Sequence, residues 1–376
     1  MHAETLIKIL ENQSASMFIG VPDSLLKPLS DYLIETCGIS DRHVIAANEG
    51  NAVAIAAGYH LATGQTPVIY MQNSGIGNAV NPIVSLLNNK VYGIPCVFII
   101  GWRGEPGTKD EPQHIYQGEI TEGLLEQIGI NVVSITPQTK PQELEAELVE
   151  HKLLFSSGKS VALLVKKGAL EYEANRPEEH NVGMLREEAI KCLVEFGRDD
   201  IFVSTTGKTS RELFEVRAHN KQPHHHDFLT VGSMGHSSSI ALGIAMQKPK
   251  SRIWCIDGDG STLMHMGAIA LVGSKALKNY IHVLINNGAH ESVGGQPTVA
   301  KDLDFGLIAR GCNYKSVYRA SNCAELNAIL EEIKDEDGPV FLEVKTVPGS
   351  RADLGRPTVA PQDNKKAFMD FLKECE

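Results

Sequence analysis

The segments RIWCIDGDGS (Arg252–Ser261) and IHVLINNG (Ile281–Gly288) decide the fold of the C-terminal half of the chain. Each begins as an apolar run of strand length and ends in polar and glycine residues, and a helical pattern lies between them. This order predicts a strand–helix–strand unit with parallel strands. Because parallel strands end at the same edge of a sheet, we expect the Asp259 carboxylate and the Asn287 amide to reach one point.

The polar ends of these two strands suit a metal ion and a phosphate group. Carboxylate and amide oxygens are ligands that Mg²⁺ prefers, and Mg²⁺ keeps further positions for water and phosphate oxygens. Gly258 and Gly260 let a polyphosphate approach the backbone, and the amides that open the next helix favour an anion. For either motif taken alone, an ordinary β-turn or loop start remains the alternative.

Strands and helices alternate over the rest of the chain. Strands are expected at Ser16–Ile19, Val68–Met71, Cys96–Ile100, Val161–Val165, Ile201–Ser204, Arg252–Ile256, Ile281–Ile285 and Val340–Val344. Helices are expected between them, at Ser24–Glu35, Pro141–Phe155, Leu185–Phe196, Ser237–Met246 and Cys323–Lys334. This rhythm is typical of α/β proteins with doubly wound parallel sheets. The apolar run Val91–Trp102 is shorter than the roughly 20 residues of a membrane span and is expected to be a buried strand.

The length of the chain indicates two domains. It has 376 residues, and one domain typically holds about 100–200. The segment Lys166–Gly183 is polar and rich in turn formers, which predicts a linker with the boundary near Asn175. We therefore expect two domains of similar layout, residues 1–174 and 175–376.

Composition and charge argue against several classes of protein. The chain has 35 Lys and Arg against 46 Asp and Glu, a net charge of −11, which argues against binding to nucleic acid or to anionic membranes. The first residues lack the basic start and apolar stretch of a secretory signal, so a cytoplasmic location is expected. The seven cysteines form no C-x-x-C pair, which predicts buried thiols rather than disulfides or a zinc site.

The pairing of GDG with Asn286-Asn287 resembles the cofactor motif of the thiamine diphosphate-dependent enzymes, which hold the diphosphate through a divalent cation. The resemblance implies their fold, with a pyrimidine domain at 1–174, a diphosphate domain at 175–376 and no middle domain. It also implies Mg²⁺ ligands at Asp259, Asn287 and the carbonyl of Ala289.

Such a cofactor implies a buried Glu that hydrogen-bonds the aminopyrimidine ring. The stretch Ala46–Gly64, AANEGNAVAIAAGYHLATG, resembles the pyrimidine-domain helix and offers Glu49. The small side chains after Glu49 allow close helix approach, and burial would raise its pKa toward a working range. The alternative is an acid in a first helical turn, which the helix dipole favours in any helix.

The resemblance places further cofactor contacts in the second half. Val231–His236 resembles the segment whose large apolar residue holds the cofactor in its bent shape, and Ser204–Ser210 resembles the loop beside the diphosphate. The latter is not a Walker loop, because Phe202 stands where that pattern requires glycine. Three consecutive histidines, His224–His226, are expected to form a loop rather than a metal site. The implied cofactor-binding residues are Glu49, Gly207, Lys208, Ser233, Met234, Gly258, Asp259, Gly260, Ser261 and Asn287.

Four further segments resemble the phosphonopyruvate decarboxylases, with the sulfopyruvate decarboxylases as the close alternative. They are GVPDSL (20–25), MQNSGIGNA (71–79), WRGEPGTKDEPQH (102–114) and NGAHESVGGQ (287–296). The resemblance implies a carboxy-lyase of phosphonate metabolism that converts 3-phosphonopyruvate, a small 2-oxo acid, to phosphonoacetaldehyde and CO₂ with thiamine diphosphate and Mg²⁺. Sulfopyruvate decarboxylases often comprise two separate subunits, so the fusion of both halves is taken to favour the phosphonate enzyme.

A substrate with two anionic groups needs cationic donors. Asp23, Arg103, Lys109 and His114 are expected to bind it, with Lys208 as a further cation, although the loop that carries three of them could equally be a surface turn. The family also pairs the pyrimidine domain of one subunit with the diphosphate domain of another, which implies at least a homodimer. A non-catalytic binding protein and a carboligase are the competing functions. The expected catalytic residues are Glu49, Asp23, His114 and His290, and Glu291 is a further candidate acid.

Overall fold

The structure is a computed structural model that describes residues 1–174 and 182–375. The chain forms two compact units, one of Met1–Pro177 with Val293–Pro297, the other of Glu178–Ser292 with Thr298–Glu376. The expected boundary near Asn175 lies outside the described residues. The return of the short segment Val293–Pro297 to the first unit was not expected from the sequence; there Gln296 Nε2 donates to Asp31 Oδ1 at 3.3 Å.

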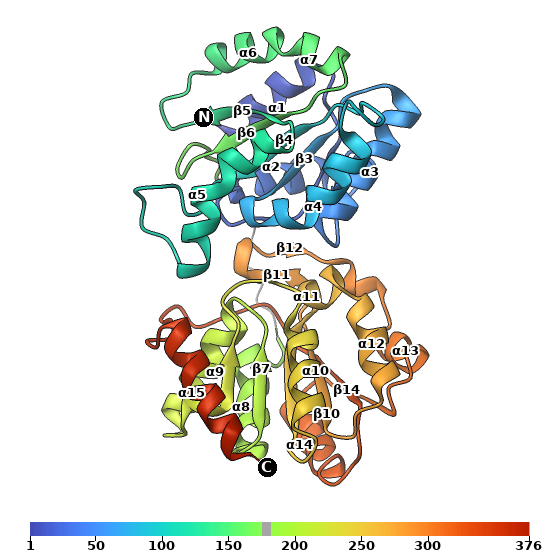
Figure 1. The fold of residues 1–376 in the computed structure, drawn as a ribbon, viewed down its shortest axis with the longest axis vertical. Coiled ribbons are helices and arrows are strands. Elements are labelled where there is room, and N and C mark those ends of the chain that lie inside the picture. The colour runs from blue at the N-terminus through green and yellow to red at the C-terminus, as the bar shows by residue number, and fades with distance from the viewer. Residues whose placement is uncertain (175–181, 376) are drawn as a thin grey trace. The chain divides into compact units, whose positions relative to one another are not determined.

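The first unit is a six-stranded parallel sheet with the strand order β2-β1-β3-β4-β6-β5. Figure 1 shows helices on both sides of this sheet. The elements are α1 (Ala3–Asn12), β1 (Phe18–Gly20), α2 (Lys27–Cys37), β2 (His43–Ile45), α3 (Glu49–Thr63), β3 (Val68–Gln72), η1 (Asn73–Gly75), α4 (Ile76–Pro82), the π-helical turn η2 (Ile83–Leu87), β4 (Val97–Gly101), α5 (Pro112–Gln127), β5 (Asn131–Ile135), α6 (Pro141–Glu150), α7 (Lys152–Ser156) and β6 (Val161–Val165).

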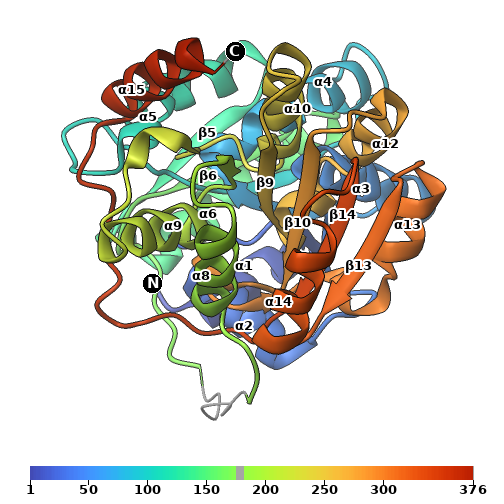
Figure 2. The same cartoon turned by 90° about the horizontal axis from the view of Figure 1, so that it is seen from below.

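The second unit repeats this layout with the strand order β13-β14-β10-β9-β7-β8, again all parallel. Figure 2 shows β9, β10, β14 and β13 side by side. The elements are α8 (Arg186–Phe196), β7 (Ile201–Ser204), α9 (Lys208–His219), η3 (His224–His226), β8 (Asp227–Leu229), α10 (Ser237–Gln247), β9 (Ile253–Gly258), α11 (Asp259–Met264), α12 (Gly267–Lys275), β10 (Tyr280–Asn286), β11 (Ala289–His290), η4 (Glu291–Val293), η5 (Val299–Asp302), α13 (Phe305–Gly311), β13 (Ser316–Ala320), α14 (Cys323–Glu332), β14 (Val340–Lys345) and α15 (Pro361–Glu374). The short strand β12 (Gln296–Pro297) lies in the segment that belongs to the first unit.

Both faces of the central strands are buried, which explains their continuous apolar sequences. In β4, Ile99 belongs to the cluster packed under α1, α2 and α6, whereas Ile100 belongs to the cluster under α3, α4 and α5. In β6, Leu163 and Leu164 divide in the same way. Alternate side chains therefore fill two separate cores, as expected for a doubly wound sheet.

All eight expected strands are present, with ends shifted by at most two residues. The longer run Val91–Trp102 was wrong as one buried strand, because only Val97–Gly101 is extended and Val91 and Tyr92 are 50% and 71% exposed. Gly93, at a φ of +64°, turns the chain before the strand begins. The expectation of buried cysteines holds only for Cys96 and Cys255, and the other five are partly exposed.

The three consecutive histidines form the short helix η3. Two of their rings stack on phenylalanines, His224 on Phe214 and His226 on Phe371.

Within residues 1–174 and 182–375, no helix combines the length and apolar character needed to cross a bilayer.

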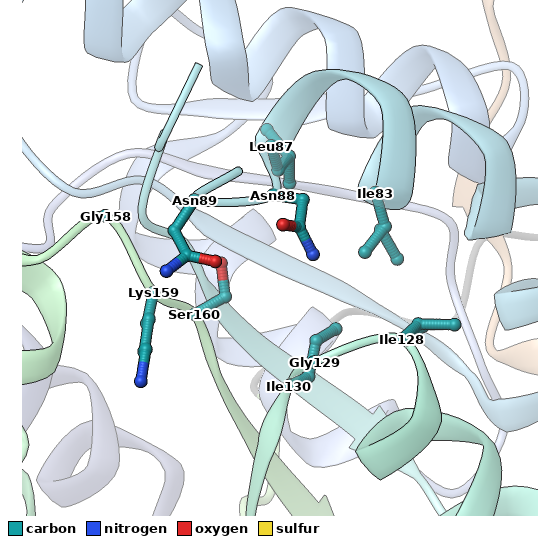
Figure 3. Close-up of a pocket in the computed structure, with 10 residues that line it drawn as sticks. All are labelled: Ile83, Leu87, Asn88, Asn89, Ile128, Gly129, Ile130, Gly158, Lys159 and Ser160. Carbon is teal, nitrogen blue, oxygen red and sulfur yellow. The ribbon is translucent and has the colours of Figure 1, made fainter. Parts of the chain in front are cut away.

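A pocket in the first unit lies at the amino-terminal ends of β5 and β6 (Figure 3). Ligands of open α/β sheets bind at the carboxyl ends of the strands, so this pocket is not where the sequence places the site. It is lined by Ile83, Leu87, Asn88, Asn89, Ile128, Gly129, Ile130, Gly158, Lys159 and Ser160.

Candidate active site

The structure places Asp259 and Asn287 at the same edge of the second sheet. Strands β9 and β10 are neighbours, and Gly258 pairs with Ile285. Asp259 follows directly as the first residue of α11, and Asn287 follows the end of β10. The geometry of the two strand ends is therefore the one expected from the sequence.

The Asp259 carboxylate is buried, with 3% of the residue exposed, and burial raises its pKa to about 6. The hydroxyl of Thr298 donates to Oδ2 at 2.5 Å and partly opposes this rise. A buried carboxylate that is hard to ionise is suited to a cation, which favours the charged form. The donor set of one carboxylate and one amide oxygen likewise fits Mg²⁺.

The Asn287 side chain is held at both ends. Its Oδ1 accepts from the backbone N–H of Ala289 at 3.0 Å, and its Nδ2 donates to Glu291 Oε2 at 3.0 Å. Glu291 also pairs with Arg186 and Lys208. Burial raises the pKa of Glu291, but these two cations outweigh it and hold the pKa below its usual value.

The phosphate-loop candidates lie at the start of α9. Gly207 is the residue before the helix at a φ of +85°, and a Cβ there would lie 2.8 Å from Ser292 Oγ. Lys208 Nζ donates to Glu291 Oε1 at 2.9 Å. Lys208, expected as a free cation for a phosphate or substrate, is therefore already ion-paired.

A second group of candidates lies around Gly260. A Cβ at this position would lie 3.0 Å from the His290 ring and 3.3 Å from Met234 Cε, so all three residues come together. Ser261 Oγ accepts from the backbone N–H of Gly235 at 3.1 Å, which ties the Ser233–Met234 segment to α11. Burial lowers the pKa of His290 to about 4, so its ring is neutral at physiological pH.

In the first unit, Glu49 is the first residue of α3, and Asn48 caps the helix by accepting from Asn51 N at 2.8 Å. Glu49 is only 5% exposed, and burial raises its pKa. Asn78 Nδ2 donates to Glu49 Oε2 at 2.8 Å. A Cβ on Gly75 would overlap the Glu49 side chain in its present position, so Gly75 leaves the room that this carboxylate occupies. A first-turn acid favoured only by the helix dipole would not need to be buried.

Asp23 lies at the carboxyl end of the first sheet and is completely buried. Its Oδ2 accepts from the backbone N–H groups of Leu25 and Leu26, and its Oδ1 accepts from Gln72 Nε2 at 2.6 Å. Burial raises its pKa despite these donors. Asp23 packs against the end of β4, where a Cβ on Gly101 would lie 2.3 Å from Oδ2.

Arg103 is restrained by Asp110 rather than free. Its Nε and Nη2 donate to the two oxygens of Asp110 at 2.8 and 2.5 Å, and its Nη1 donates to Ser24 Oγ at 2.9 Å. Burial opposes ionisation of Asp110, but Arg103 and two backbone N–H groups hold the pKa of Asp110 well below its usual value. The guanidinium is thereby fixed beside the Asp23 loop.

His114 and Lys109 are the other two residues of the segment Gly101–His114 that are expected to bind the substrate. Burial and the nearby Arg103 lower the pKa of His114 to about 4. His114 is therefore neutral at physiological pH and offers a hydrogen bond rather than the positive charge expected of it. Lys109 lies exposed on the loop.

Sequence reasoning missed the residues that hold these side chains. Asp110 lay within a quoted motif but had no assigned role, and only its spacing from Arg103 in a polar loop could have signalled a pair. Thr298 and Arg186 carried no signal at all, because they are distant in the sequence from Asp259 and Glu291, the groups they contact.

Comparison with known proteins matches both units to one family. Residues 2–139 match the N-terminal TPP-binding domain of thiamine pyrophosphate enzymes, and residues 205–344 match the C-terminal TPP-binding domain. A phosphonopyruvate decarboxylase of Streptomyces viridochromogenes is 34% identical over 98% of this chain and 94% of its own length. The chain belongs to the thiamine diphosphate-dependent decarboxylases.

Two further decarboxylases are similar over nearly their full lengths. A phosphonopyruvate decarboxylase of Streptomyces hygroscopicus is 34% identical over 99% of this chain and 94% of its own. A sulfopyruvate decarboxylase of Methanosarcina acetivorans is 27% identical over 98% of this chain and 97% of its own. The second match corrects one argument from the sequence: because a sulfopyruvate enzyme also spans both domains, the fusion of the two halves in this decarboxylase does not separate the two substrates.

Proposed function

We propose that this decarboxylase converts 3-phosphonopyruvate to phosphonoacetaldehyde and CO₂. The observation that carries the proposal is the similarity to two phosphonopyruvate decarboxylases over almost the whole chain, at 34% identity. Sulfopyruvate is the second candidate substrate, supported by the 27% identity to the Methanosarcina enzyme. The two substrates share a 2-oxo acid and a second anionic group and differ in the charge of that group.

Each unit offers residues for a different part of the cofactor. Asp259, Asn287 and the Ala289 carbonyl would hold Mg²⁺, and Gly207, Lys208, Ser233, Met234, Gly258, Gly260 and Ser261 would contact thiamine diphosphate. Glu49 would hydrogen-bond the aminopyrimidine ring; its burial and raised pKa support this role. The chemistry that thiamine diphosphate supplies when bound is a sink for the electron pair that CO₂ leaves behind.

The substrate would meet Arg103 in the first unit. Because Asp110 and Ser24 fix the guanidinium, its orientation toward an anionic group costs little conformational entropy. Neutral His114 would donate a hydrogen bond, and exposed Lys109 would add charge. Asp23, with its raised pKa, is the group able to hold the proton that replaces CO₂. His290, which is neutral, would act there as a hydrogen-bond partner.

We further propose a homodimer that acts in the cytoplasm. Helix α3, which begins with Glu49, exposes apolar residues along one stripe: Ala54, Ile55, Gly58, Leu61 and Ala62. Leu61 is the most exposed large side chain of this stripe, at 73%. Contiguous exposed apolar surface marks protein interfaces. The seven free thiols suit a reducing compartment.

The proposal is tested by kcat/KM for phosphonopyruvate, sulfopyruvate and pyruvate with Mg²⁺ and thiamine diphosphate. Phosphonopyruvate is expected to give the highest value, and a higher value for sulfopyruvate would transfer the assignment to the sulfonate. Product analysis with an added acceptor aldehyde distinguishes a carboligase.

Glu49→Gln is expected to lower kcat by at least about 100-fold, in line with the loss of acid–base assistance. Glu143→Gln is the matched control, since Glu143 is also an acid in a first helical turn but is exposed. Equal activities of the two variants would contradict the role of Glu49.

A further inference from the structure

Each asparagine at the end of β10 is held by its own carboxylate. Asn287 Nδ2 donates to Glu291 Oε2 at 3.0 Å, and Asn286 Nδ2 donates to Glu343 Oε1 at 2.8 Å. Each carboxylate in turn pairs with two cations, which are Arg186 and Lys208 for Glu291 and Arg319 and Lys345 for Glu343. Two adjacent amides thus have the same kind of support from separate sets of residues.

The support of Glu291 is itself part of a cluster of ion pairs. Arg186 Nη1 donates to Glu291 Oε2 at 2.7 Å, and Lys208 Nζ donates to Oε1 at 2.9 Å. Arg186 also donates to both oxygens of Glu212, at 2.6 and 2.8 Å. Two acids and two cations balance in charge, so the cluster holds an ionised Glu291 in one place.

The amide of an asparagine has two different ends, since Nδ2 only donates and Oδ1 only accepts. An ionised carboxylate only accepts, so Glu291 must face Nδ2 of Asn287. The Oδ1 atom is consequently turned to the other side, where it accepts from Ala289 N at 3.0 Å and keeps a second lone pair.

We propose that Glu291 is a positioning residue that presents Oδ1 of Asn287 to the divalent cation. The inference rests on the proposed metal site. It replaces the role of general acid considered for Glu291 from the sequence. Arg186, Lys208 and Asn287 donate to its two oxygens, which leaves the carboxylate no reason to carry a proton.

Glu291→Gln tests the proposal because glutamine has one oxygen and one NH₂ group. Its single oxygen can replace only one carboxylate oxygen, so its NH₂ group faces either Lys208 or the pair of Arg186 and Asn287. In the second orientation two donors oppose each other at Nδ2 of Asn287, and Oδ1 is no longer held toward the metal position. Loss of such a supporting contact typically weakens metal binding about 10–100-fold, and this is the expected loss.

The measurement is a titration of the full chain with Mn²⁺ at saturating thiamine diphosphate, with free Mn²⁺ followed by electron paramagnetic resonance. Glu343→Gln is the matched control, because it removes the same charge from the same kind of contact, but on Asn286. It is expected to bind Mn²⁺ like the wild type. An equal loss in both variants would show an effect of charge rather than orientation and would overturn the proposal.

The double variant Glu291→Gln/Asn287→Asp exchanges donor and acceptor. The introduced glutamine would be the donor and the introduced carboxylate the acceptor, with the net charge kept and an oxygen presented in either orientation. The double variant is expected to recover Mn²⁺ binding, and it is the decisive variant if Glu291→Gln alone does not fold. A folded double variant that binds no Mn²⁺ would overturn the proposal.

Two other results are equally decisive. Glu291→Gln with wild-type Mn²⁺ affinity but reduced kcat would indicate a general acid and refute the positioning role. A wild-type chain that binds no Mn²⁺ would refute the metal site itself, and the inference would fall with it. The failure of the inference alone is thereby distinguished from that of the proposed function.

Discussion

Asp259→Asn tests whether the strand end at β9 is built for a cation. Burial raises the pKa of Asp259 from its usual 3.8 to about 6. Each unit of pKa shift corresponds to about 1.4 kcal/mol. The rise in the pKa of Asp259 therefore means that its ionisation lowers the free energy of unfolding by about 3 kcal/mol when no cation is bound. Asparagine keeps the shape and can still accept from Thr298 but carries no charge.

The pH dependence has a defined sign. The folded pKa lies above the unfolded one, so the native state binds the proton more tightly, and the cation-free protein loses stability as pH rises from about 4 to about 6. At neutral pH the Asn variant is expected to be more stable than the wild type by up to about 3 kcal/mol. At about pH 4 and below the two proteins should be equal.

The assay is urea unfolding followed by the fluorescence of Trp254, which is fully buried in β9. The second tryptophan, Trp102, lies in the other unit and is replaced by Phe in both proteins so that one signal remains. Mg²⁺ with thiamine diphosphate should then stabilise the wild type and not the variant. A variant no more stable than the wild type at neutral pH, or one stabilised equally by the ligands, would refute the reasoning.

Three other predictions concern two residues of the first unit and one buried ion pair of the second unit. Gly75→Ala places a Cβ 2.4 Å from Glu49 Oε1, so kcat should fall while circular dichroism stays unchanged; wild-type kcat would show that Glu49 tolerates displacement. Arg103→Gln should raise KM for phosphonopyruvate and leave KM for pyruvate unaltered, and a parallel rise for both would exclude recognition of the second anionic group. Arg217→Met leaves the carboxylate of Asp227 buried without its partner at 2.9 Å, at an expected cost of about 3–5 kcal/mol in urea unfolding; a smaller loss would mean that Asp227 becomes protonated.

The sequence predicted the central strands but none of the edge strands. In the two six-stranded sheets the missed strands are β2, β5, β8 and β13, which are the outer ones, and the two-residue strands β11 and β12 were missed as well. A central strand is buried on both faces and reads as a continuous apolar run, whereas an edge strand such as β5, NVVSI, alternates between exposed and buried positions. Short, mixed segments of this kind resemble loops when read alone.

The common position of two candidate residues was predicted because the spacing along the chain carries that part of the geometry. Asp259 and Asn287 follow neighbouring parallel strands, so their common edge could be inferred. The partners that set their chemistry could not be, since Arg186 and Glu291 are 105 positions apart and Asp259 and Thr298 are 39 apart. For the same reason the neutral state of His114 was not foreseen, because it depends on burial and on the packed position of Arg103.

The glycine at the end of β4 also bears on how the sheet finds its alignment. A slip of β4 by one residue would move Phe98 and Ile100 into the core that holds Val97 and Ile99. Gly101 adds a further constraint, because a side chain there would overlap Asp23. Asp23 and Gly101, which lie where catalysis is expected, would therefore also oppose misaligned pairing of β4 during folding. Variants made there to change the substrate can then lose activity because the strands mispair and not because the chemistry is lost.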